Sequence, residues 1–259
     1  MRLLILTLAG ALCAHAQWLN RPTPGTPRLP GGKPNLTAAA PRTGGKPDLS
    51  GIWQAEGHVD NGGLGESYVS KYLLNFFADF KPGEEPVQPA AAERFRKGAA
   101  GGQKLELLCP PPRLPATDLL PIPFKIVQTP GLTLILYEDF ENFRQIHTDG
   151  RSLPVDPQPS FLGYSVGRWE DGTFVVKSSG FNDLLGIDAS GHPNSEAMQV
   201  TERFRRVDFG HMELQITVED PRTYTKPVTV NVHLGLLPDT ELLESVCEDE
   251  KDKIHLAGK

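Results

Sequence analysis

The chain has 259 residues, of which 39% are hydrophobic and 22% are charged, and its formal net charge is −6 at neutral pH. This length is enough for one large domain with an extension, and the mildly acidic balance argues against nucleic acid as a partner. The three cysteines show no CxxC or Cys/His spacing typical of a metal site.

The N-terminus has the features of a secretory signal peptide. A positive charge at Arg2 precedes an apolar run over residues 3–13 and a small-x-small cleavage site at residues 14–16. The apolar run is too short to span a membrane, and no later segment reaches that length. We therefore expect a signal peptide over residues 1–16, cleavage after Ala16, and a soluble mature protein that is secreted or periplasmic.

Cleavage would leave two cysteines, Cys109 and Cys247, in an oxidising compartment. An even count without metal spacing predicts one disulfide between them, and two unpaired thiols are the alternative. The bond would tie the segment before the repeated strands to the end of the last one. Closing so long a loop would stabilise the fold by about 4 kcal/mol in the chain-entropy description.

The next segment, residues 17–47, is rich in proline and glycine and predicts a flexible or extended leader. A single β domain over residues 48–259 follows, with a helical insertion at about 64–98. Residues 64–80 place aromatic and apolar side chains at helical spacing, and residues 89–98 indicate a second short helix that ends at a glycine.

A long series of alternating polar and apolar residues follows the insertion. Successive side chains of a strand point to opposite faces, so this alternation indicates strands with one buried face. Short connections between them favour an all-β fold, an antiparallel up-and-down barrel of lipocalin-like character, with a β-sandwich as the alternative. The expected strands are 125–129, 132–138, 143–147, 163–169, 173–179, 198–207, 211–219, 227–236 and 241–247.

A Gly-x-Trp motif at Gly51-Ile52-Trp53 opens the β domain. It resembles the motif of lipocalin-like barrels, which places a tryptophan across the closed end of the barrel. A tryptophan packed beneath a helix is the alternative. The helical insertion after the motif departs from a standard lipocalin.

One candidate site is the interior of the barrel. An apolar lumen of about eight strands has room for one small hydrophobic or amphipathic ligand, although it could instead be filled by its own side chains. Arg144 and Arg168 could reach an anionic ligand, or could form surface ion pairs. The expected ligand-binding residues are Trp53, Val176, Phe204, Leu214, Ile216, Val230, Val232 and Arg168.

The other candidate site is the long connection over residues 180–197. Its histidine and carboxylates could act as acid and base or hold a metal ion, whereas the same residue types also stabilise surface loops. His147, at the end of a strand, could join them across the rim. The candidate catalytic residues are His192, Asp188, Glu196, Asp183 and His147. The sequence contains no P-loop, GxGxxG or HExxH motif.

Several stretches together resemble a family of secreted bacterial proteins of uncharacterised activity. The resemblance implies export and a shared fold, and it carries over no activity, cofactor or catalytic residue. The matching stretches are PDLSGIW (47–53), CP (109–110), IVQTP (126–130), TDGR (148–151), GYSVGRW (163–169), GFND (180–183), GHP (191–193), TER (201–203), DP (220–221) and LLE (242–244).

These observations favour an exported barrel that binds a small hydrophobic or amphipathic molecule. The alternative is a secreted hydrolase or lyase with a histidine–carboxylate site, with or without metal, in the 180–197 loop. A structural protein tethered by its leader is a third possibility. The sequence indicates no particular cofactor and no oligomeric state.

Overall fold

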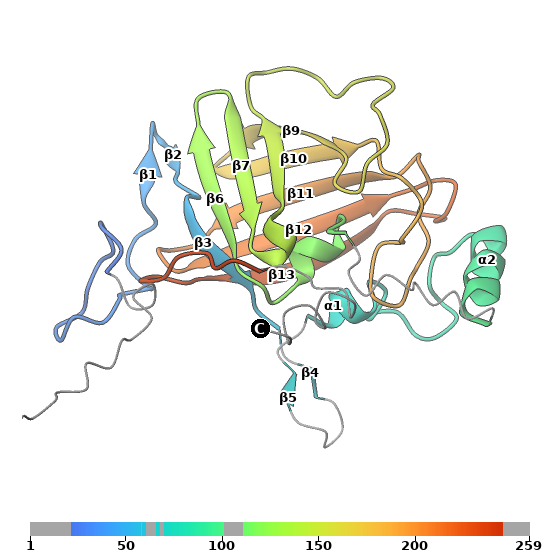
Figure 1. The fold of residues 1–259 in the computed structure, drawn as a ribbon, viewed down its shortest axis with the longest axis horizontal. Helices are drawn as coiled ribbons and strands as arrows, with labels where there is room; N and C mark the ends of the chain where they lie inside the picture. The colour runs from blue at the N-terminus through green and yellow to red at the C-terminus, as the bar shows by residue number, and fades with distance from the viewer. Residues whose placement is uncertain (1–21, 58, 61–65, 68–69, 101–110, 246–259) are drawn as a thin grey trace, which may run out of the picture.

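The computed structural model describes residues 22–57, 59–60, 66–67, 70–100 and 111–245. Nine of its strands close into one barrel in the order β10-β11-β12-β13-β3-β6-β7-β8-β9 (Figure 1). The predicted all-β barrel is therefore confirmed. The barrel strands are β3 (Gly51–Ala55), β6 (Phe124–Thr129), β7 (Leu132–Tyr137), β8 (Phe143–His147), β9 (Tyr164–Glu170), β10 (Thr173–Ser179), β11 (Gln199–Arg206), β12 (His211–Glu219) and β13 (Val228–Leu236).

One pair of neighbouring strands departs from the expected antiparallel pattern. β8 and β9 are parallel, with Ile146 opposite Ser165 and His147 opposite Val166. Nine strands that alternate in direction cannot all be antiparallel when the sheet closes, because the first and last then run the same way. The long connection between β8 and β9 makes this crossover possible, since it carries the chain back along the barrel.

The remaining differences lie at the two ends of the predicted series. The ninth expected strand spans residues 241–247, but residues 241–245 form no strand. The position beside β13 is taken by β3, with Trp53 opposite Leu236. The expected helix within 64–80 is one turn, α1 (Lys71–Leu74), because the chain turns extended at Asn75. α2 (Pro89–Ala100) matches the second expected helix. Short elements complete the description: β1 (Arg42–Thr43), β2 (Lys46–Pro47), β4 (Val59–Asp60), β5 (Glu66–Ser67) and the 3-10 turns η1 (Ala116–Leu119) and η2 (Asp139–Glu141).

The described part of the expected leader, residues 22–47, lies against the barrel. The Arg28 guanidinium donates to both carboxylate oxygens of Asp239, at 2.7 and 2.5 Å. Backbone amides of Phe209 and Gly210 donate to carbonyls of the leader, at 2.8 and 2.7 Å. Within this segment Arg28 bridges to Pro34 and β1 pairs with β2, so it folds back on itself rather than running as one extended stretch, and the contacts above hold it against the barrel.

One end of the barrel, here called the tryptophan end, carries Trp53 and the turn between β11 and β12. The indole is fully buried and its Nε1 donates to the Leu49 carbonyl at 2.9 Å. The Arg206 guanidinium lies 4.9 Å above the ring and donates to the carbonyls of Asp48, Asp208 and Phe209. The Gly-x-Trp motif thus sits at a barrel end covered by an arginine rather than by a helix.

Candidate functional site

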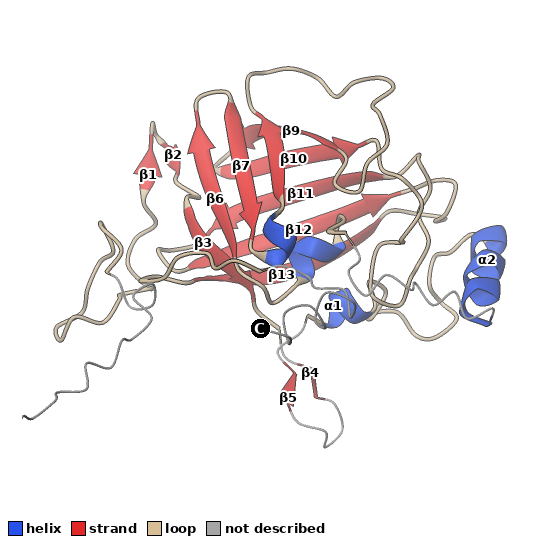
Figure 2. Cartoon of the chain, in the orientation of Figure 1, coloured by secondary structure: helices blue, strands red, loops and turns tan. Residues whose placement is uncertain are grey.

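The opposite end of the barrel, here called the η1 end, gathers most of the structure outside the strands. β10 ends and β11 begins there, so the 180–197 connection crosses this end, and η1 leads directly into β6. Figure 2 shows α1 and the short helical turns grouped beside this end of the red strands. Loops carried by a rigid barrel are where binding groups are usually found.

Beneath η1 the barrel interior holds a buried polar group of side chains, here called the lumen cluster: Arg144, Glu202, Asp118, Tyr137, Ser165 and Ser178. Arg144 donates from Nη1 to Glu202 Oε1 at 2.9 Å, and from Nε and Nη2 to the two serine hydroxyls, at 3.0 and 2.9 Å. Its Nη1 lies 3.5 Å from Asp118 Oδ2, and the Tyr137 hydroxyl donates to Asp118 Oδ1 at 2.8 Å. The two carboxyl side chains and the guanidinium are at most 2% exposed.

The lumen cluster has two carboxyl groups and one guanidinium, so full ionisation would leave an excess negative charge inside the barrel. Burial, followed by the nearby Glu202 charge, raises the pKa of Asp118 well above its usual range. Burial also raises the pKa of Tyr137, with the Asp118 carboxyl adding to the effect. A protonated Asp118 leaves one ion pair, Arg144 with Glu202, and balances the charge.

The outer side of η1 forms the floor of a groove of about 400 Å³. Burial raises the pKa of the Asp139 carboxyl at its edge. Phe140, on η2, has a left-handed backbone with φ of 57°, a conformation that is strained for a bulky side chain. The groove is lined by Leu73, Pro111, Pro112, Arg113, Ala116, Thr117, Leu120, Asp139, Phe140 and Ala189.

Two consecutive residues of η1 carry unsatisfied polar atoms. Thr117 Oγ1 and Asp118 Oδ2 are buried without a hydrogen-bond partner, and among the described residues only Thr223 Oγ1 shares this property. Thr117 lines the groove, whereas Asp118 faces the lumen cluster. Buried polar groups usually find partners, so unsatisfied atoms on both sides of one turn need a functional or conformational explanation.

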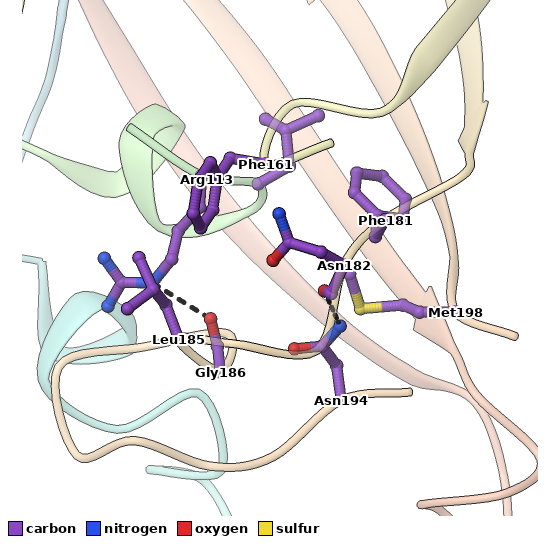
Figure 3. Close-up of a pocket in the computed structure, with 9 residues that line it drawn as sticks. Arg113, Phe161, Phe181, Asn182, Leu185, Gly186, Asn194 and Met198 are labelled. Carbon is purple, nitrogen blue, oxygen red and sulfur yellow. Dashed lines mark hydrogen bonds between the residues drawn. The ribbon is translucent and has the colours of Figure 1, made fainter. Parts of the chain in front are cut away.

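Arg113 separates the groove from a second, smaller cavity. Its Nε donates to the Gly186 carbonyl at 2.9 Å and its Nη2 to the Asp188 carbonyl at 3.0 Å, which ties the 180–197 loop to the segment before η1. Burial lowers the pKa of this guanidinium. Figure 3 shows the small cavity between Phe161, Phe181 and Met198; its volume of about 10 Å³ is close to that of one water.

The 180–197 loop brings His192 and Asp188 together, as the sequence suggested. His192 Nδ1 lies 2.6 Å from Asp188 Oδ2, and the same oxygen accepts the Phe76 amide at 2.7 Å. An ionised carboxylate only accepts, so this contact places the ring proton on Nδ1. The imidazole stacks on Phe95 at 4.6 Å between ring centres, and both side chains of the pair are largely buried.

The other candidate catalytic residues do not join this pair. Asp183 and Glu196 are exposed. His147 ends β8 at the opposite end of the barrel and stacks on Tyr164 at 5.1 Å, because β8 runs away from the η1 end. No group of three histidine, cysteine or acidic side chains arranged for a metal occurs within the part of the chain that is described.

Seven of the expected ligand-binding residues belong to one buried apolar cluster: Trp53, Val176, Phe204, Leu214, Ile216, Val230 and Val232. None of the seven lines the groove or the small cavity. Arg168 is exposed and pairs with Glu170 at 2.6 Å on the barrel exterior. Cys109 and Cys247, the expected disulfide, lie outside the described residues, as does the expected signal peptide.

Sequence reasoning identified Arg144 as a candidate anion-binding residue but missed its partners. One signal was available in β11, where Glu202 shares a face with Val200 and Phe204 and thus interrupts an apolar face with a carboxylate. Asp118 and Thr117 gave no such signal, because they lie in a proline-rich connector without periodicity. Arg113 was missed for the same reason.

The comparisons with known proteins add no relative: neither protein-family models, nor curated proteins, nor solved structures match this chain. Within the described residues, no helix combines the length and the apolar character needed to cross a membrane.

Proposed function

We propose that this protein binds a small amphipathic molecule in the groove over η1. The observation that carries the proposal is the groove itself, whose floor includes Thr117; the Thr117 hydroxyl is buried just beneath that floor and has no hydrogen-bond partner among the described residues. A ligand with one polar group would satisfy this hydroxyl once the Thr117 side chain turns toward the groove. Its apolar part would cover the walls that Leu73, Leu120 and Phe140 provide.

The size and chemistry of the groove support this function. Ligand pockets usually enclose about 300–1,000 Å³ and combine apolar walls with a few convergent polar groups. The groove of about 400 Å³ falls in this range, and Arg113, Thr117 and Asp139 supply its polar groups. The proposed binding site is therefore at the barrel mouth, whereas the sequence suggested the lumen.

We propose further that the protein acts outside the cytoplasm. The support is the signal-peptide pattern of residues 1–16 and the resemblance to secreted bacterial proteins. A disulfide between Cys109 and Cys247 belongs to the same proposal, since an oxidising compartment would favour it. Mass spectrometry of protein from the exported fraction tests all of this: it should start at Gln17 and lose one disulfide on reduction. A chain that retains residues 1–16 would contradict export.

The binding proposal is tested with N-phenyl-1-naphthylamine, an uncharged fluorescent probe. Ala189 is exposed and lines the groove, so Ala189→Leu should fill it and weaken probe binding about tenfold or more. The matched control, Ala39→Leu, changes an exposed alanine elsewhere and should bind like the natural protein. Equal binding by both variants, or no binding by the natural protein, would contradict the proposal.

A second pair of variants tests the polar contact. Thr117→Val and Thr223→Val each remove a buried hydroxyl that has no partner, but only Thr117 lines the groove. A series of amphipathic ligands with hydroxyl or amide groups should lose affinity for Thr117→Val by about fivefold to tenfold. The Thr223→Val protein should bind them unchanged. The same loss of affinity in both variants would show that it comes from a change in overall stability and not from a lost contact with the ligand.

A second candidate function, hydrolysis or elimination, rests on the His192–Asp188 pair. A carboxylate that orients an imidazole is the arrangement of a general base, and among the described residues Nε2 of His192 has no hydrogen-bond partner. The pair lines neither the groove nor the small cavity, which ranks this function second. If the pair is catalytic, the natural protein should hydrolyse a panel of activated esters and the His192→Gln variant should not. Equal rates of hydrolysis by the two proteins would exclude this catalytic function.

A further inference from the structure

η1 links the groove to the lumen cluster through a single turn of chain. Ala116, Thr117 and Leu120 line the groove, while Asp118 points into the barrel toward Arg144. The turn is held by amide hydrogen bonds from Thr117 to the Arg113 carbonyl at 2.8 Å and from Asp118 to the Pro115 carbonyl at 3.1 Å. Any displacement of Asp118 must therefore move the floor of the groove.

The position of Asp118 depends on a charge balance inside the barrel. Among the described residues, the titratable groups that face it are Tyr137 from β7, Arg144 from β8 and Glu202 from β11. β9 and β10 contribute only hydroxyl groups, from Ser165 and Ser178. With a proton on Asp118 the cluster is neutral, and without it two carboxylates face one guanidinium in a closed interior.

The Asp118 carboxyl is also held less firmly by hydrogen bonds than the Glu202 carboxyl. Glu202 accepts from two nitrogens of Arg144, whereas Asp118 Oδ2 lies 3.5 Å from Nη1 and has no hydrogen-bond partner within the described part of the chain. The groove runs along the outer side of η1, although the four residues of this turn are themselves buried. If the cluster loses its proton, the carboxylate that can leave the barrel is therefore Asp118.

We propose that the proton on the buried Asp118 carboxyl controls whether η1 is seated in the barrel, and thereby controls the affinity of the groove for its ligand. This regulation rests on the proposed binding function, because it acts on the same site. With the proton bound, Asp118 stays in the lumen and the groove has its floor. Without it, repulsion between two buried carboxylates drives η1 outward and the groove loses affinity.

The direction of the pH effect follows from the pKa of Asp118, which burial and Glu202 raise. The folded protein holds this proton at pH values where the unfolded chain has released it. The stabilising contribution is therefore fully present below the unfolded value of about 4 and is lost as the pH rises through the raised folded value. Increasing pH thus loosens η1.

The test measures two properties of the full chain from about pH 5 to about pH 9: hydrogen-exchange protection factors of the amides of residues 116–120, and the affinity for N-phenyl-1-naphthylamine. Four proteins are compared: the natural one, Asp118→Asn, Glu202→Gln and the control Glu196→Gln, an exposed carboxyl at the same end. Each of the first two variants removes one buried carboxylate with little change of shape, so the surplus charge no longer arises.

In the natural protein and the control, protection and affinity should both fall by about tenfold or more across this range. In Asp118→Asn and Glu202→Gln both properties should stay constant. A fall that persists in these two variants, or no fall in the natural protein, would overturn the regulation. If protection falls as expected but no protein binds the probe, the proposed binding function fails, while the pH control of η1 stands.

Discussion

The two ends of the barrel differ in how fully their polar groups are paired. At the tryptophan end, Arg206 covers Trp53 and donates to three backbone carbonyls, and Lys125 pairs with Glu241 at 3.1 Å. At the η1 end, Thr117 and Asp118 each leave a buried oxygen without a partner.

Volume does not distinguish the ends, because a cavity of about 390 Å³ also lies at the tryptophan end, beside the leader. What distinguishes them is unsatisfied polarity, which a structure tolerates where a ligand or a movement will use it. The comparison therefore supports the proposed binding at the η1 end and a stabilising role for the tryptophan end.

The largest effect should come from breaking the central ion pair of the lumen cluster. Arg144→Met leaves Glu202 buried without a counter-charge and should lower the free energy of unfolding by about 4 kcal/mol, measured by urea denaturation. The double variant Arg144→Met with Glu202→Leu should recover most of this loss, since no uncompensated charge remains. A single variant as stable as the natural protein would contradict the charge balance on which the η1 end depends.

A smaller loss of stability is expected from a substitution at the tryptophan end. Arg206→Met keeps an aliphatic side chain over Trp53 but removes the donors to three carbonyls, and should lower the free energy of unfolding by about 2 kcal/mol. Arg205→Met, which removes an exposed ion pair with Glu213, should change it by less than about 0.5 kcal/mol. Similar losses in the two variants would show that Arg206 does not stabilise this end specifically.

The smallest effect has the opposite sign. Thr117→Val removes a buried hydroxyl that has no partner, so it should raise the free energy of unfolding by up to about 1 kcal/mol while it weakens ligand binding. A gain in stability with a loss of binding is expected at a functional position. If Thr117→Val instead lowers stability in the absence of ligand, the hydroxyl has a structural partner and the contrast between the two ends weakens.

The sequence predicted the parts of this molecule that depend on local periodicity. The alternation in β12 and β13 predicts both strands to within a residue. The pairing of β3 with β13 could not be predicted, because it joins residues far apart in the chain, and periodicity shows which segments are strands but not which strands pair.

The candidate site was predicted only in part. His192 and Asp188 were found because they lie four residues apart on one loop. The lumen cluster was not predicted, since Arg144, Glu202 and Asp118 come from three distant segments and meet only once the barrel closes. An acidic residue on an apolar strand face, as at Glu202, is the one sequence feature that pointed to it.

The central claim, that the η1 end is the functional end, is tested most directly by mapping probe binding with amide NMR. Adding N-phenyl-1-naphthylamine should shift the resonances of Thr117, Leu120 and Ala189, which line the groove, and leave the Trp53 indole and Gly51 unchanged. Shifts confined to Gly51, Phe209 and the leader would place the binding site in the cavity at the tryptophan end. That result would contradict the account.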